Sequence, residues 1–146
     1  MTCVAPHLRF REARERLQLS VDDAAALCGI SAPCVWDIES HAAELTACYS
    51  AMDVFRFSEA LHIPASAFFG DDIAGAPVSA AALGQMIREE CRVRKITLEQ
   101  FEDAVGWKLG ESMEPPGRLL EDMTLDGLQW LCRELRIDWR RVLAKP

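Results

Sequence analysis

Apolar residues along this chain recur at intervals of three and four, the spacing that places side chains on one face of an α-helix. The clearest case is the segment 49–61. Its Val54, Phe57 and Leu61 all fall at helical spacing. Helices are expected over residues 8–17, 20–28, 31–40, 49–61, 64–69 and 98–105. The pattern therefore predicts an all-α protein.

Two helices in the first half have recognisable start and stop residues. Ser20 stands where an N-cap is expected, and the acids at 22–23 suit the positive end of the helix that follows. Gly29 is placed to end that helix with a left-handed residue. Ser31 can cap the next helix, with Pro33 in its first turn. This segment is thus predicted to be two short helices joined by a sharp turn.

A wider pattern of residue types surrounds that turn. It has the spacing Ser-x3-Ala-x4-Gly-Ile-Ser-x3-Val-x2-Ile-Glu, preceded by an arginine. Its residues are Arg14, Ser20, Ala24, Gly29, Ile30, Ser31, Val35, Ile38 and Glu39. The pattern resembles the lambda-repressor/Cro-like helix-turn-helix (XRE) family, and residues 60–69 look like the closing helices of that family. The resemblance covers residues 8–70 and implies a five-helix domain whose third helix enters the DNA major groove.

The resemblance also assigns roles to individual residues. The positions that would face DNA are Ser31, Ala32, Pro33, Trp36, Asp37 and Ser40, with Arg9 and Arg11 of the first helix as further candidates. Trp36 could pack against a thymine methyl or a sugar, whereas Asp37 only accepts hydrogen bonds and suits cytosine. In the alternative interpretation, these two side chains face a protein partner or the second half of the chain. Arg14 and Glu39 are expected to form an internal ion pair that supports the motif.

The second half of the chain repeats the first. At an offset of 77 residues, 87–89 aligns with 10–12, 96–99 with 19–22 and 105–107 with 28–30. Towards the C-terminus the offset becomes 74, which pairs Leu128 with Val54 and Leu131 with Phe57. A period shared over most of a half predicts tandem units. We therefore expect two tandem lambda-repressor-like five-helix units, at residues 1–72 and 79–146, joined by a linker at 73–78.

The second unit departs from the family pattern where DNA would be read. Cys91 takes the place of Arg14, and Pro115 and Pro116 stand where the recognition helix would continue. Because proline disfavours helical backbone both at itself and at the preceding residue, residues 108–113 can form only a short helical turn. The second unit is expected to have kept the scaffold and lost the reading element.

Four arginines near the C-terminus form a second candidate surface. They are Arg133, Arg136, Arg140 and Arg141, interleaved with Trp130 and Trp139. They would contact phosphates or an acidic partner. In the alternative interpretation they lie on the outside of one amphipathic helix, with Leu128, Leu131, Leu135 and Trp139 on its core side.

The net charge of −7 is unevenly distributed. Residues 1–75 contain five arginines and no lysine against eleven acids, giving −6, whereas residues 76–146 contain eleven cations against twelve acids, giving −1. DNA-binding surfaces are usually basic. The acidic first half therefore favours a protein partner, while the helix-turn-helix spacing favours DNA.

The sequence gives little support for catalysis, cofactor or metal binding, or membrane contact. The three histidines are scattered, and there is no nucleophile elbow, glycine-rich phosphate loop or histidine pair at metal spacing, so neither an enzyme nor a cofactor is predicted. The six cysteines are expected to be free thiols, mostly in the core, and no metal site is predicted. With no signal peptide and no apolar run near the roughly 20 residues of a membrane span, a cytoplasmic location without membrane contact is expected.

Two functions remain. The first is a sequence-specific DNA-binding transcriptional regulator of the XRE type, bacterial or from a phage. It would place residues 31–40 in the major groove of double-stranded DNA, as a homodimer on a palindrome or as one chain spanning two half-sites. The alternative is an acidic protein-interaction module, such as an antitoxin or immunity-type protein, that masks the basic surface of a partner such as a toxin.

Overall fold

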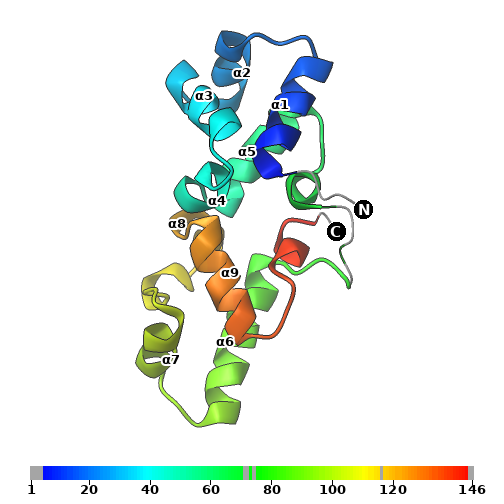
Figure 1. Ribbon diagram of the computed structural model, residues 1–146. Coiled ribbons are helices and arrows are strands. Elements are labelled where there is room, and N and C mark those ends of the chain that lie inside the picture. Colours follow the sequence, from blue (N-terminus) through cyan, green and yellow to red (C-terminus); the bar gives the residue numbers. More distant parts are fainter. Residues whose placement is uncertain (1–4, 71–72, 74, 116, 145–146) are drawn as a thin grey trace.

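Helices account for the regular structure throughout the described part of the chain (Figure 1). The computed structural model describes residues 5–70, 73, 75–115 and 117–144. Within these ranges it contains α-helices, short 3₁₀ helices and an isolated β-bridge, but no strand. The prediction of an all-α fold is confirmed. None of the helices in these ranges is long and apolar enough to cross a membrane.

In the first half, the helices follow the expected order with shifted boundaries. They are α1 (Pro6–Arg16), α2 (Val21–Cys28), α3 (Ala32–Ser40), α4 (Glu44–Cys48), α5 (Ala51–Leu61) and the 3₁₀ helix η1 (Ala65–Phe69). α1 begins two residues before its predicted start, because Pro6 can occupy the first turn without losing a hydrogen bond. α5 begins only after Ser50, which caps it, so Tyr49 lies outside the helix.

The second half differs from its prediction near the C-terminus. It consists of α6 (Ala80–Arg94), α7 (Leu98–Val105), η2 (Gly110–Ser112), α8 (Arg118–Asp122), α9 (Leu125–Glu134) and η3 (Trp139–Val142). α7 has its predicted bounds. The prediction of one amphipathic helix that includes Trp139 is wrong, because α9 ends at Glu134 and the left-handed Arg136, with φ of 59°, turns the chain. Trp139 belongs to η3.

Of the helices in the described ranges, three begin with reciprocal capping pairs. These are Ser20 with Asp23 at α2, Ser50 with Asp53 at α5, and Thr97 with Gln100 at α7. In each pair the hydroxyl oxygen accepts a hydrogen bond from the backbone N–H three residues on, and the later side chain accepts from the N–H of the cap. Each pair satisfies two backbone donors that the helix itself leaves unpaired. The predicted caps at Ser20 and Thr97 are confirmed.

The helix boundaries repeat with the offsets found in the sequence. α2 and α7 are related by 77 residues, and α4 and α5 are related to α8 and α9 by 74. Left-handed residues follow the same offsets: Gln18 and Lys95, Gly29 and Gly106, and His62 and Arg136. Because a left-handed residue stops a helix, equal spacing of these residues gives the two halves matching helix ends. α3 is the exception, since the short η2 takes its place.

The buried residues of the two halves form a continuous hydrophobic core. In the first half, the Phe10 ring meets Phe57 edge-on and stacks on Phe68, with centroid distances of 6.0 Å in both cases. Between the halves, α4 packs on α9 and α5 packs on α8. Figure 1 shows these four helices in the middle of the molecule, with α1–α3 at one end and α6 and α7 at the other. The two halves therefore share their buried surface.

The segment predicted to be a linker is also in contact with the rest of the protein. Val78 is buried, and its N–H donates to the carbonyl oxygen of Arg141 at 3.0 Å. The Arg141 side chain donates in turn to the carbonyl oxygen of Ala76 at 2.7 Å. Nearby, the rings of Phe69 and Trp139 lie 4.8 Å apart. η3 thus holds the connection between the halves against the end of the first half.

Candidate functional site

The turn between α2 and α3 is built from local interactions. Gly29 ends α2 with φ of 72°, and its N–H donates to the carbonyl oxygen of Ala25. Ser31 caps α3 by accepting a hydrogen bond from the backbone N–H of Cys34 at 3.4 Å, while its hydroxyl donates to the Cys34 sulfur at 3.1 Å. The inner face of α3 is fully buried at Val35. The outer face of α3 is therefore held in one orientation and left open.

That outer face carries the six residues predicted from the resemblance. Ser31, Pro33, Trp36 and Ser40 are exposed, and Ala32 and Asp37 are half-buried. Trp36 is 60% exposed, which is unusual for so large an apolar side chain, and its ring lies edge-on to His41 at 6.1 Å. The structure thus brings all six residues to one end of the molecule. No arginine or lysine belongs to α3.

Arg14 and Glu39 join α1 to α3 by a two-pronged ion pair. Arg14 Nε donates to Glu39 Oε2 at 2.7 Å and Arg14 Nη2 donates to Glu39 Oε1 at 2.8 Å. The third nitrogen, Nη1, donates to the carbonyl oxygen of Leu19 at 2.9 Å. The side chains are only 13% and 9% exposed, and the hydrogen bond to Glu39 raises the pKa of Arg14 above its ordinary value. This geometry fixes the angle between α1 and the C-terminal end of α3.

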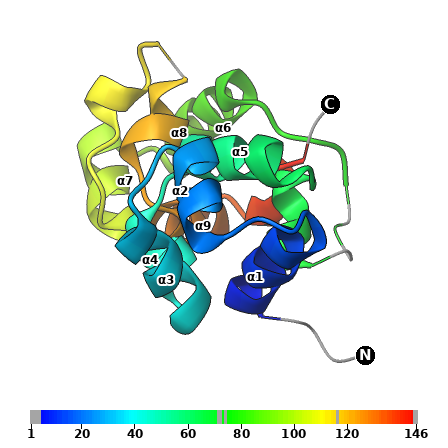
Figure 2. The same cartoon turned by 90° about the horizontal axis from the view of Figure 1, so that it is seen from above.

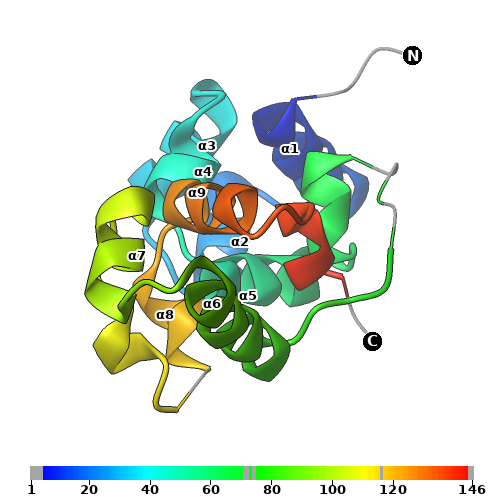
Figure 3. The same cartoon turned by 90° about the horizontal axis from the view of Figure 1, so that it is seen from below.

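The two α1 arginines predicted to approach DNA lie in different surroundings. Arg11 is exposed and pairs with Glu15 at 3.1 Å, a contact that water and other ligands can replace. Arg9 is half-buried. Figures 2 and 3 show α1 and α3 projecting from the same side of the molecule. Cations of α1 can therefore reach a ligand that touches α3.

Arg56 is a cation near this turn that sequence reasoning missed. It lies on α5, yet its Nη1 atom is 3.5 Å from where a side chain on Gly29 would begin. It forms an ion pair with Asp53 and is half-exposed. Burial raises the pKa of Cys28 to about 11, against a smaller lowering effect of Arg56. No local signal in the sequence places Arg56 here, because α5 meets the turn only in the folded chain.

Among the described residues, the corresponding part of the second half forms no outward helix. The segment after Gly106 forms only η2, whose start is held by Glu102: the carboxylate accepts hydrogen bonds from the N–H groups of Leu109 and Gly110. Glu102 stands 77 residues after Ala25, a small buried residue of α2. A carboxylate in that position occupies the backbone donors of the turn. The second half therefore presents no surface comparable to α3.

The predicted C-terminal basic surface is divided by the fold. Arg140 forms an ion pair with Asp138 at 2.8 Å and donates to the carbonyl oxygen of Phe69 at 3.2 Å. Its hydrogen bond lowers the pKa of Asp138. Arg141 is committed to the backbone of Ala76, as described above. Arg133 lies over the Trp130 ring at 4.7 Å and is exposed, as is Arg136. Arg140 and Arg141 thus bind backbone carbonyls of residues 69 and 76, whereas Arg133 and Arg136 remain exposed to solvent.

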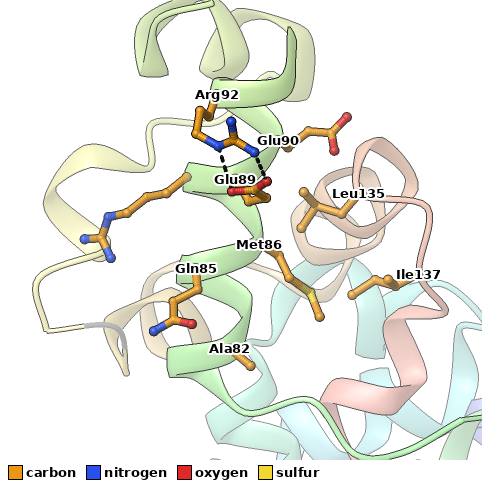
Figure 4. Close-up of a pocket in the computed structure, with 9 residues that line it drawn as sticks. Ala82, Gln85, Met86, Glu89, Glu90, Arg92, Leu135 and Ile137 are labelled. Atoms are coloured by element: carbon orange, nitrogen blue, oxygen red, sulfur yellow. Dashed lines mark hydrogen bonds and ion pairs between the residues drawn. The ribbon is translucent and has the colours of Figure 1, made fainter. Parts of the chain in front are cut away.

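One groove in the surface is lined by apolar and charged side chains. This groove, of about 750 Å³, lies between α6 and the end of α9. Figure 4 shows Met86 pointing towards Leu135 and Ile137, with the Glu89–Arg92 pair (3.0 Å) at one side. It contains charged side chains but no histidine, cysteine or serine.

The described cysteines are free thiols that divide between core and surface. Cys28 and Cys132 are buried, Cys34 and Cys91 are partly buried, and Cys48 is exposed. The sequence predicted that most cysteines lie in the core, whereas two of the five described cysteines are fully buried. Cys3 lies outside the described residues. Within the described ranges, no group of three or more histidine, cysteine or acidic side chains is placed to hold a metal ion.

Comparisons with protein-family models, with curated proteins and with solved structures find no match to this chain. Any function must therefore be argued from the geometry of α1–α3 and its charges.

Proposed function

We propose that this protein is a DNA-binding transcriptional regulator of the XRE helix-turn-helix type, with α3 as its recognition helix. The observation that carries the proposal is the combination of the capped α2–α3 turn with the buried Arg14–Glu39 pair. Together they hold an exposed helix face rigidly at one end of the molecule. A helix entering a major groove needs this rigidity, because base contacts tolerate little variation in position.

The reading surface implies a particular chemistry. Trp36 supplies an apolar face for thymine methyl groups or sugars, and the hydroxyls of Ser31 and Ser40 supply donors. Asp37 accepts a hydrogen bond and favours a cytosine amino group. We therefore expect recognition dominated by apolar contacts and few charges.

Phosphate contacts must come from outside α3. The candidates are Arg9 and Arg11 of α1 and Arg56, which lies beside the α2–α3 turn. If each neutralises one phosphate, log K should fall against log salt with a slope of about −3, since each phosphate contributes about −0.9 on duplex DNA. A steeper slope would mean that further cations of the chain take part.

The proposal is tested by enriching duplexes from a random-sequence library at low salt and measuring the affinity of the enriched duplex. Trp36→Ala should weaken binding at least tenfold, equivalent to about 1.4 kcal/mol, and leave the circular dichroism spectrum unchanged. Trp130→Ala is the matched control, because Trp130 is similarly exposed (51%) but lies on α9. Equal affinities for Trp36→Ala and the unmodified protein would contradict the proposal.

A second function, an acidic protein-interaction module of the antitoxin or immunity type, is favoured by the charge of −6 on residues 1–75 and the absence of cations from α3. Asp37→Lys separates the two functions by the sign of its effect. On a DNA-binding face the substitution adds a cation, which should strengthen binding to duplexes of unrelated sequence and steepen the salt slope by about one, while the enriched duplex loses the contact between Asp37 and cytosine. On a face that docks a basic protein, it should weaken binding to the product of the adjacent gene, and no duplex should be enriched even at low salt.

A further inference from the structure

The two halves contact each other reciprocally, because each half uses the same two helices in the contact. α8 is the counterpart of α4 and α9 is the counterpart of α5, by the offset of 74. Because α4 packs on α9 and α5 packs on α8, each half offers the same two elements to the other. This reciprocity defines an isologous interface, which normally joins two identical subunits. Here it lies within one chain.

One backbone contact makes the reciprocity specific. Ser50 caps α5 and Thr124 caps α9, and these residues occupy equivalent positions in the two halves. They face each other as the two residues of an antiparallel β-bridge, next to a hydrogen bond of 2.9 Å from the Leu125 N–H to the carbonyl oxygen of Tyr49. Equivalent residues of two related units face each other in this way only where the pseudo-twofold axis that relates the units passes between them.

The surface involved is closed to a second chain. Leu45 of α4, Ala51 of α5 and Leu119 of α8 are each 1% exposed, and Leu125 of α9 is fully buried. A second copy of the protein could use these elements only by displacing the second half, which shares its core with the first. The second half therefore occupies the place that another subunit would take.

The second half also restricts what the chain can read. In a dimer that binds two half-sites, both recognition helices face the same side of the duplex, about 34–36 Å apart. Within the described residues, the segment of the second half that corresponds to α3 forms only the short η2. Figures 2 and 3 show this segment (yellow) pointing in a different direction from α3, although both lie towards the left of Figure 1. One chain therefore offers a single helix that can enter a groove.

We propose that this chain is a monomer that reads one non-palindromic DNA half-site, with its second half acting as a built-in replacement for the second subunit. The part concerning DNA rests on the function proposed above, whereas the monomeric state does not. The expectation of a homodimer on a palindrome is thereby replaced by one chain per site. Such a site is short, so its affinity depends on α3 and the few cations around it.

Two measurements on the intact chain test the proposal. Sedimentation equilibrium without DNA, from the lowest detectable concentration to the solubility limit, should give the monomer mass of 16.3 kDa throughout. Duplexes enriched from a random-sequence library should share one asymmetric motif. Titration of the best duplex should give one chain per duplex. A duplex that carries a second, inverted copy of the motif should bind a second chain without cooperativity, whatever the spacing between the two copies.

The outcomes are distinguishable. A dimer mass in solution overturns the inference about the second half, whatever the DNA result. A palindromic motif occupied by two chains, or cooperative binding to paired motifs, overturns the single-site inference even if the free protein is a monomer. Failure to enrich any duplex at low salt overturns the proposed function and the inference of a single DNA half-site. In that case the mass from sedimentation equilibrium alone decides whether the second half replaces a second subunit.

Discussion

Replacing Arg14 by methionine tests whether the buried ion pair holds α3 against α1. The substitution keeps an apolar stem of similar length but removes both hydrogen bonds to Glu39, whose side chain is 9% exposed. Glu39 is then left as a nearly buried charge without its partner. Removing one member of a buried pair costs about 3–5 kcal/mol, and because Arg14 is 13% exposed we expect the lower end of that range, about 3 kcal/mol.

The double substitution Arg14→Met/Glu39→Leu should recover most of this loss. Replacing both charges by apolar side chains leaves neither one unpaired, which is often neutral for stability. What remains lost is the hydrogen bond from Arg14 to the carbonyl oxygen of Leu19, at 2.9 Å, for which we expect about 1 kcal/mol. The double variant should therefore be more stable than Arg14→Met alone.

Urea denaturation followed by circular dichroism and tryptophan fluorescence measures these free energies as a double-mutant cycle. Cys91→Ala is the internal control, since Cys91 occupies the position of Arg14 in the second half and forms no ion pair within the described residues. The reasoning is refuted if the free energy of unfolding of Arg14→Met lies within about 0.5 kcal/mol of that of the unmodified protein. It is also refuted if the two single substitutions simply add in the double variant.

Two further predictions concern backbone strain and pH. Gly29→Ala and Gly106→Ala should each lower the free energy of unfolding by about 1–2 kcal/mol, because φ values of 72° and 79° disfavour a residue with a β-carbon. Neither site is crowded, so the backbone conformation alone accounts for the loss. An unchanged denaturation midpoint would contradict this. Burial raises the pKa of Cys28 to about 11 and that of Cys132 to about 12, so above about pH 9 these thiols ionise in the unfolded chain but stay protonated in the folded one. The unfolded state then binds fewer protons, so stability should fall as pH rises from 9 to 11. The fall should be less steep in the Cys28→Ala/Cys132→Ala variant, and equal slopes would exclude this explanation.

The parts of the fold that could be predicted from the sequence are those set by interactions over three or four residues. The caps at Ser20 and Thr97 involve partners three positions away, and the stop at Gly29 depends on the conformation of a single residue. Such features depend little on the rest of the chain. They appear in the structure where the pattern placed them.

Boundaries that depend on longer-range packing were predicted less well. The C-terminal arginines fit a continuous amphipathic helix by spacing alone, yet α9 ends at Glu134 and Arg140 turns back to the carbonyl oxygen of Phe69. Arg56 approaches the α2–α3 turn from a helix more than twenty residues later in the chain. Neither contact has a local signature, because each depends on the way α5, η1 and η3 pack together.

The sequence by itself determined the helical class, the period that relates the two halves, and the residues on the open face of α3. The helical class follows from side-chain periodicity and the period from the alignment of the two halves, whereas the residues on the open face were implied by the resemblance to the XRE family. Only the tertiary structure decided that the halves bury equivalent helices against each other. A sequence repeat predicts that two units have similar structures. The rotation that relates one unit to the other depends on which apolar faces pack together. By packing α4 on α9 and α5 on α8, that rotation closes the surface that a second subunit would use, whereas the loss of the second reading element was already expected from Pro115 and Pro116.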